Sequence, residues 1–131
     1  MQRVLIVEDE VMVALELESI LEDLGHQVVG IAADSDIALR LAQDRPDLAL
    51  VDLNLRDGLT GASLGQQLAG EYGVKVVFLT ANPSLLSSGV PGTVGVVPKP
   101  YDAEQVENVL EYVTGHVPAP PPAFVLFEQR A

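Results

Sequence analysis

Five short apolar runs constrain the fold of this 131-residue chain more than any other feature. They are rich in β-branched residues and occupy positions 4–7, 26–33, 47–52, 74–80 and 94–97. A short, continuous apolar run is typical of a strand that is buried on both faces. Such strands occur in parallel sheets covered by helices, so the chain is predicted to be an α/β protein.

The segments between the runs supply the predicted helices. Before Gly25, apolar side chains recur at helical spacing, at Val13, Leu17, Ile20, Leu21 and Leu24. A second helix carries Ile37, Ala38, Leu41 and Ala42, with Asp34 or Ser35 as its N-cap, and a third covers 62–72. A final helix is capped by Asp102 with Gln105 three residues later, and it turns Val106, Val109, Leu110 and Val113 inward.

The segment 81–93 differs from the others because Pro, Gly and Ser are frequent in it, so at most one short helix is expected there. Strands that alternate with helices, with right-handed crossovers, predict a doubly wound five-stranded parallel sheet with helices on both faces. Ligands of such sheets bind at the carboxyl ends of the strands, near the point where the strand order reverses.

The composition excludes several classes of function. Nineteen acidic residues against seven basic ones give a net charge of −12, and no Lys/Arg cluster exists, so nucleic acid and anionic membranes are poor partners. The absence of cysteine excludes disulfides and thiolate metal sites. No apolar segment approaches the roughly 20 residues that span a bilayer, and the N-terminus does not have the pattern of a signal peptide. A cytoplasmic protein is therefore expected.

The polar residues that follow the strands form one predicted site. Glu8 and Asp9 follow the first strand, Asp52 ends the third, Thr80 ends the fourth, and Lys99 follows the fifth. Three carboxylates at one edge of a sheet repel each other unless a cation is present. Hard oxygen ligands favour Mg²⁺, which commonly binds carboxylates together with a phosphate. The pattern thus predicts Mg²⁺-dependent phosphoryl chemistry.

The same residues carry a resemblance to a known family. The acidic pair in "VLIVEDE", the aspartate in "LVDLNL", the threonine in "FLTAN" and the lysine in "PKPY" resemble the response regulator receiver domain, the CheY-like phospho-acceptor module of two-component signalling. The order and spacing are close to those of the family over residues 3 to about 115. The resemblance implies a flavodoxin-like fold and a signalling domain that is no enzyme beyond its own phosphorylation and dephosphorylation.

The resemblance also implies a role for each site residue. Asp52 would accept a phosphoryl group from a sensor histidine kinase or a phosphotransfer protein. Mg²⁺ would be held by Asp9 and Asp52 directly, by Glu8 largely through water, and by the backbone carbonyl of Asn54. Thr80 and Lys99 would contact phosphoryl oxygens during transfer.

The site residues also have other interpretations. An isolated Asp52 would more often be structural, and Glu8 and Asp9 could serve only to complement a helix dipole. A haloacid-dehalogenase-type phosphatase needs a second aspartate where Asn54 stands. A flavodoxin-like nucleotide binder would need a phosphate-binding loop after the first strand. An adaptor of the same fold that works without phosphorylation, or a phosphate sink, stays open as the alternative.

The chain departs from the family pattern at two positions. Val96 occupies the place of the aromatic residue that often lies three positions before the lysine, so signal transmission is expected to use Thr80 and the loop after the fourth strand. Arg56 stands where a proline is frequent. His26 and His116 are interpreted as solvated residues that bind no ligand.

The predicted domain organisation is a receiver at 1–116 and a Pro-rich tail with an apolar end at 117–131. On this division the chain is a stand-alone receiver that acts through a downstream protein target. Four prolines are expected to extend the tail, and Phe124 and Phe127 are expected to dock in a groove of their own domain, of a second copy in a homodimer, or of a kinase. A frayed terminus is the simpler reading. Truncation after His116 is expected to change association while leaving phosphorylation of Asp52 intact.

Overall fold

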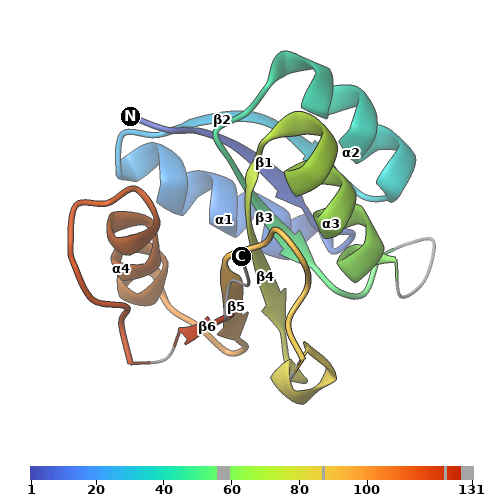
Figure 1. Ribbon diagram of the computed structural model, residues 1–131. Helices are drawn as coiled ribbons and strands as arrows, with labels where there is room; N and C mark the ends of the chain where they lie inside the picture. The colour runs from blue at the N-terminus through green and yellow to red at the C-terminus, as the bar shows by residue number, and fades with distance from the viewer. Residues whose placement is uncertain (56–59, 87, 123, 128–131) are drawn as a thin grey trace.

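The computed structural model describes residues 1–55, 60–86, 88–122 and 124–127. Strands and helices alternate along the chain as the apolar pattern predicts (Figure 1). The elements are β1 (Arg3–Val7), α1 (Val11–Asp23), β2 (Gln27–Ala32), α2 (Ser35–Leu41), the 3₁₀ turn η1 (Ala42–Asp44), β3 (Leu48–Asp52), α3 (Gly61–Tyr72), β4 (Lys75–Thr80), the 3₁₀ turn η2 (Pro83–Leu86), β5 (Gly95–Pro98), α4 (Ala103–Val113) and β6 (Val125–Leu126).

The sheet has the strand order β2-β1-β3-β4-β5-β6. The first five strands pair in parallel, which confirms the predicted doubly wound architecture. The sixth strand was not predicted: Val125 and Leu126 pair antiparallel with Val96 and Gly95 at the edge of the sheet. The order reverses between the neighbouring strands β1 and β3, and ligand sites of doubly wound sheets form at such a reversal.

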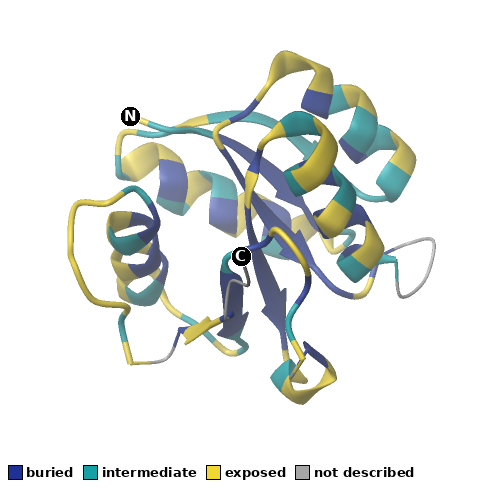
Figure 2. Cartoon of the chain, in the orientation of Figure 1, coloured by how far each residue is buried: buried dark blue, intermediate teal, exposed yellow. Residues whose placement is uncertain are grey.

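Two apolar cores lie on the two faces of the sheet, and Figure 2 shows the central strands β1, β3 and β4 as mostly buried and the helices as partly exposed. Side chains of α1 and α4 pack on one face, and side chains of α2 and α3 pack on the other. Alternate residues of a strand enter opposite cores, so Ile6 of β1 packs toward α1 while Leu5 packs toward the other face. This packing fixes the strands, and it therefore fixes the direction of the side chains at the strand ends.

The predicted helix caps are present. The side chain of Asp34 accepts a hydrogen bond from the backbone N–H of Ile37 at 3.0 Å, so Asp34 rather than Ser35 caps α2. Asp102 and Gln105 form a reciprocal capping box on α4, with two hydrogen bonds of 2.9 Å. Among the described residues between β4 and β5, the only helical element is the single turn η2, as the composition predicted.

Val13 of the predicted first helix is partly buried and lines a surface cavity. One local prediction was wrong. His26 is partly buried rather than solvated, and its Nδ1 accepts a hydrogen bond from the backbone N–H of Gln2 at 3.0 Å. Burial, followed by the positive charge of the N-terminus, lowers the pKa of His26.

Two phenylalanines of the predicted tail are buried. Residues 115–120 are exposed, whereas Phe124 packs in the core beside α4 and Phe127 packs in the core on the opposite face. Within the described ranges, no helix has both the length and the apolar character required to cross a membrane.

Candidate functional site

Three carboxylates meet where β1 and β3 end. Glu8 directly follows β1, Asp9 is next, and Asp52 is the last residue of β3. Each of the three side chains offers an oxygen atom that lies within 4.8 Å of those of the other two. This set of hard oxygen donors fits a small divalent cation such as Mg²⁺.

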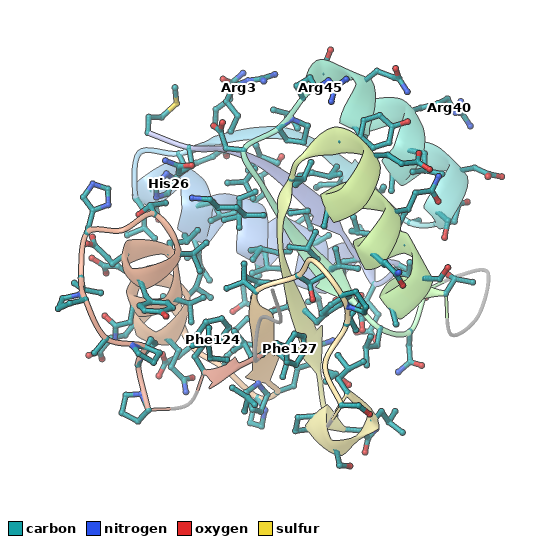
Figure 3. The ribbon with its side chains drawn as sticks, viewed as in Figure 1. Arg3, His26, Arg40, Arg45, Phe124 and Phe127 are labelled. Atoms are coloured by element: carbon teal, nitrogen blue, oxygen red, sulfur yellow. The ribbon has the colours of Figure 1, made fainter. Side chains whose placement is uncertain are left out.

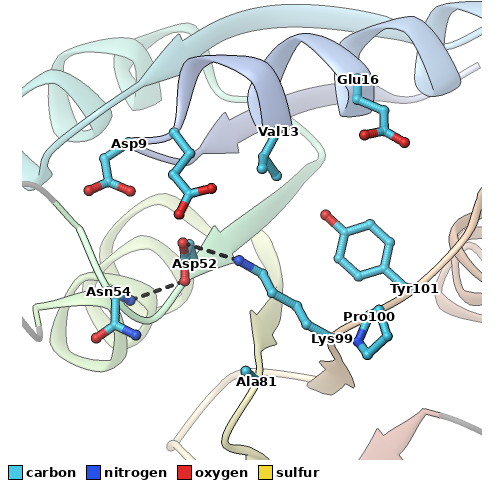
Figure 4. A pocket seen from close by; sticks show the side chains of 10 residues that line it. Asp9, Val13, Glu16, Asp52, Asn54, Ala81, Lys99, Pro100 and Tyr101 are labelled. Carbon is cyan, nitrogen blue, oxygen red and sulfur yellow. Dashed lines mark hydrogen bonds and ion pairs between the residues drawn. The ribbon is translucent and has the colours of Figure 1, made fainter.

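Lys99 directly follows β5, and its side chain extends past the end of β4 to this cluster. Its backbone N–H donates to the carbonyl of Thr80 at 2.7 Å, which attaches the residue to the end of β4. Its Nζ lies 3.4 Å from both Glu8 Oε1 and Asp52 Oδ2, and Figure 4 shows the side chain pointing at Asp52. The following Lys99–Pro100 peptide bond is cis. Burial alone would lower the pKa of Lys99, but the charges and hydrogen bonds of Asp52 and Glu8 outweigh it and raise that pKa.

Glu8 is the most enclosed member of the cluster, with 1% of its surface exposed. Its Oε2 accepts a hydrogen bond from the backbone N–H of Glu10 at 3.3 Å. Burial, and then the hydrogen bond and charge of Asp52, raise the pKa of Glu8 from 4.5 to about 7, although Glu10 N–H and Lys99 act in the opposite direction. Near neutral pH the metal-free site therefore retains a proton on Glu8 in part of the molecules.

The backbone around Asp52 fixes the direction of its carboxylate. The N–H of Asn54 donates to Asp52 Oδ1 at 3.1 Å, which leaves Oδ2 facing Lys99. The start of α3 lies against the same turn, where a Cβ on Gly61 would lie 2.5 Å from the carbonyl oxygen of Asp52 and 2.7 Å from Leu53 Cα. Only glycine permits this approach. Gly61 is thus a positioning residue that the sequence pattern did not reveal.

Thr80 lies beside this turn because Asp52 pairs with Leu79 in the β3–β4 register. It is 2% exposed, and its Oγ1 accepts a hydrogen bond from the backbone N–H of Asn82 at 3.0 Å. The fold thus brings all the predicted site residues to one edge of the sheet: Glu8, Asp9, Asp52, Asn54, Thr80 and Lys99. Arg56 lies outside the described residues.

A cavity of about 640 Å³ opens from the carboxylates along α1 (Figure 4). Its outer wall contains Val13 and Glu16 of α1, opposite Pro100 and Tyr101. Burial, and then the charges of Glu8, Glu16 and Asp52, raise the pKa of Tyr101, so its hydroxyl remains protonated. Tyr101 had no predicted role, although its position directly after Lys99-Pro100 placed it beside the site.

Comparison with known proteins agrees with this geometry. The chain is 36% identical over 110 residues to the phyllosphere-induced regulator PhyR of Methylorubrum extorquens, which covers 82% of this chain and 41% of that protein. It is 37% identical over 83 residues to the transcriptional regulatory protein PdtaR of Mycobacterium tuberculosis, with 61% of this chain and 39% of that protein covered. The chain thus spans less than half the length of these two curated relatives.

A solved structure has the same fold over almost its whole length. The solution structure of the receiver domain of the Erythrobacter litoralis PhyR response regulator superposes with a TM-score of 0.79 at 32% identity, covering 92% of this chain and 95% of that one. The family model described as the response regulator receiver domain matches residues 4–111. The chain therefore belongs to the response regulator receiver domains of bacterial two-component systems.

Proposed function

We propose that this receiver domain accepts a phosphoryl group on Asp52 from a sensor histidine kinase or a phosphotransfer protein. The observation that supports this most directly is the position of Lys99 Nζ, 3.4 Å from both Asp52 and Glu8 in a cluster of three carboxylates. A lysine and a cation-binding set on either side of one aspartate can neutralise charge as a phosphoryl group arrives.

The transfer has a simple balance of bonds and electrons. A carboxylate oxygen of Asp52 forms a bond to phosphorus, and the P–N bond of the donor's phosphohistidine breaks. The electron pair of that bond returns to the imidazole nitrogen, which then takes up a proton. The product is an acyl phosphate on Asp52.

The residues of this chain divide the work of that step. Asn54 N–H orients one oxygen of Asp52, and Lys99 pairs with the charge that accumulates on the phosphoryl oxygens. Thr80 would donate its hydroxyl hydrogen to another of these oxygens, because its Oγ1 acts only as the acceptor in the hydrogen bond from Asn82 N–H. Glu8, Asp9, Asp52 and the Asn54 carbonyl would hold Mg²⁺, which when bound supplies positive charge to the phosphoryl oxygens.

The output is proposed to be contact with a downstream protein. One matched structure, from Bartonella quintana, is described as the anti-anti-sigma factor PhyR, a name for a protein that acts on another protein. It is 34% identical to this chain, covers 81% of this chain and 45% of that one, and superposes with a TM-score of 0.70. Val96 is fully buried in the core and supplies no aromatic ring. The change at Thr80 would therefore pass to the segment that follows β4.

Phosphorylation can be tested by mass. The full chain is incubated with Mg²⁺ and a small phosphodonor, and the intact mass is measured for the wild type, Asp52→Asn and the control Asp36→Asn, whose side chain is exposed on α2. The wild type and the control are expected to gain one phosphoryl group, and only when Mg²⁺ is present. Asp52→Asn is expected to gain none.

A phosphoryl mass on folded Asp52→Asn would refute the assignment of the acceptor. Absence of phosphorylation in the wild type, both with the small donor and with a phosphorylated histidine-containing donor protein, would refute the proposal. That result would leave the phosphorylation-independent adaptor as the better interpretation.

A further inference from the structure

The strand β5 pairs on its outer side with a short strand from later in the same chain. Val125 and Leu126 form β6, and the backbone N–H of Phe127 donates to the carbonyl of Val94 at 2.9 Å. Residues 124–127, called here the tail segment, carry a buried phenylalanine at each end, with 5% and 6% of the residue surface exposed. The two side chains between them are about half exposed, at 48% for Val125 and 46% for Leu126.

The tail segment holds the sheet edge from both sides. Phe124 lies on the α4 side, where its ring contacts Tyr112 edge-on with centroids 6.0 Å apart. Phe127 lies on the other side and packs against Phe78 of β4 at 6.3 Å (Figure 3). An edge that accepts aromatic side chains on both faces is a shaped site for an extended peptide, with one pocket in each core.

Gly95 makes this site specific for a closely bound strand. A Cβ at this position would lie 2.8 Å from Phe124 Cζ and would also clash with the carbonyl oxygen of Val125. The three atoms nearest to that Cβ all belong to the tail segment. The absence of a side chain at Gly95 is therefore matched to the strand that passes over it.

The connection to the tail segment has the properties of a hinge for exchange between copies. Residues 115–120 are exposed, and prolines at 118, 120, 121 and 122 favour an extended, semi-rigid chain. The stretch 117–127 contains no charged residue, although the whole chain carries −12. It can therefore approach a second acidic copy without adding to the repulsion.

We propose that the edge of β5 is a strand-binding site whose partner is the tail segment of a second copy of this chain, so that two copies exchange tails. Each site offers the same pockets and the same backbone groups to either tail, and exchange of an identical element is a low-cost route to a dimer. The inference does not depend on phosphorylation, so its failure and that of the proposed function are separate.

Two complementary full-length variants test the exchange. Phe124→Ala/Phe127→Ala has an intact site and a tail that cannot bind, whereas Gly95→Ala has an intact tail and an obstructed site. Each is expected to sediment as a monomer alone. An equimolar mixture is expected to contain a heterodimer in which the tail of the second variant fills the site of the first.

The control mixture pairs Gly95→Ala with a variant that carries all three substitutions and therefore has neither a functional tail nor an open site. This mixture is expected to remain monomeric. Monomers in the complementary mixture, with both variants folded by circular dichroism and amide shifts, would overturn the proposal. A dimer in the control mixture would also overturn it, because the contact would then lie elsewhere.

A second measurement covers the case in which the double variant does not fold. The chain lacks cysteine, so Val117→Cys, at an exposed position, provides a single labelling site. Donor-labelled and acceptor-labelled copies of this otherwise wild-type protein are mixed at high concentration. Energy transfer that grows with time, and that Gly95→Ala reduces severalfold, supports exchange, whereas its absence overturns it.

Discussion

Replacing Glu8 by glutamine should stabilise the metal-free protein, and the gain should depend on pH. Glu8 is buried, and its pKa in the fold is about 7, against the ordinary glutamate value of 4.5. Because the folded state binds this proton more tightly than the unfolded state, ionisation of Glu8 costs stability as pH rises from 4.5 to 7. Glutamine has nearly the same shape and never ionises, so Glu8→Gln does not incur this cost.

The magnitude follows from the two pKa values. Each unit of difference between the two pKa values corresponds to about 1.4 kcal/mol in the free energy of unfolding. Nearly the full difference counts at pH 8 and only a small part at pH 5. Between these two pH values the free energy of unfolding of the wild type should therefore fall by roughly 2 to 3 kcal/mol relative to that of Glu8→Gln. The charge of Lys99 lowers the pKa of Glu8 and is already included in that value. Saturating Mg²⁺ should raise the free energy of unfolding of the wild type more than that of Glu8→Gln, because the cation favours the ionised carboxylate.

Urea unfolding with a metal chelator at pH 5 and pH 8 measures this difference. Glu22→Gln, at an exposed position of α1, is the matched control and should change the free energy of unfolding by about 0.5 kcal/mol or less at both pH values. A stability gain of Glu8→Gln that is equal at pH 5 and pH 8 would show that the wild-type carboxyl titrates normally, and the reasoning would be wrong.

Three further substitutions test the site and the packing around it. Lys99→Ala should leave Mg²⁺ affinity near that of wild type or raise it, because a positive charge is removed, while phosphorylation slows; a large fall in affinity in an NMR-monitored metal titration would contradict this role. Gly65→Ala should lower the free energy of unfolding by about 1–3 kcal/mol, because its Cβ would lie 2.6 Å from Phe78 Cε1. The control Gly70→Ala has open space and should be neutral or stabilising, so equal urea midpoints for the two would argue against overpacking. Asp34→Ala should lower the free energy of unfolding by about 1 kcal/mol, because it removes the N-cap of α2. Asp34→Asn should retain most of that stability, because asparagine is also a good N-cap. An equal loss in both variants would point to a role other than capping.

The sequence was sufficient to predict the five parallel strands, the helices and the edge where the site lies. Buried parallel strands appear as continuous apolar runs, and helix caps such as Asp102 act on neighbours three residues away. Parallel strands all end at the same edge, so residues that follow different strands, such as Glu8 and Lys99, could be placed together from their order alone. They are 91 positions apart and lie in hydrogen-bond contact.

Only the tertiary structure decided the surroundings of those residues. The raised pKa of Glu8 depends first on its burial by elements distant in sequence. The cavity that Val13 lines exists because Tyr101 lies across from α1. The sequence predicts that the phenylalanines of the tail dock in a groove. It does not predict pairing with a strand, because a Pro-rich segment with two strand residues and two phenylalanines has no periodicity that identifies a sheet partner. That partner was fixed by the fit of the tail over Gly95 and by an unpaired edge of β5, and both exist only after the other five strands have assembled.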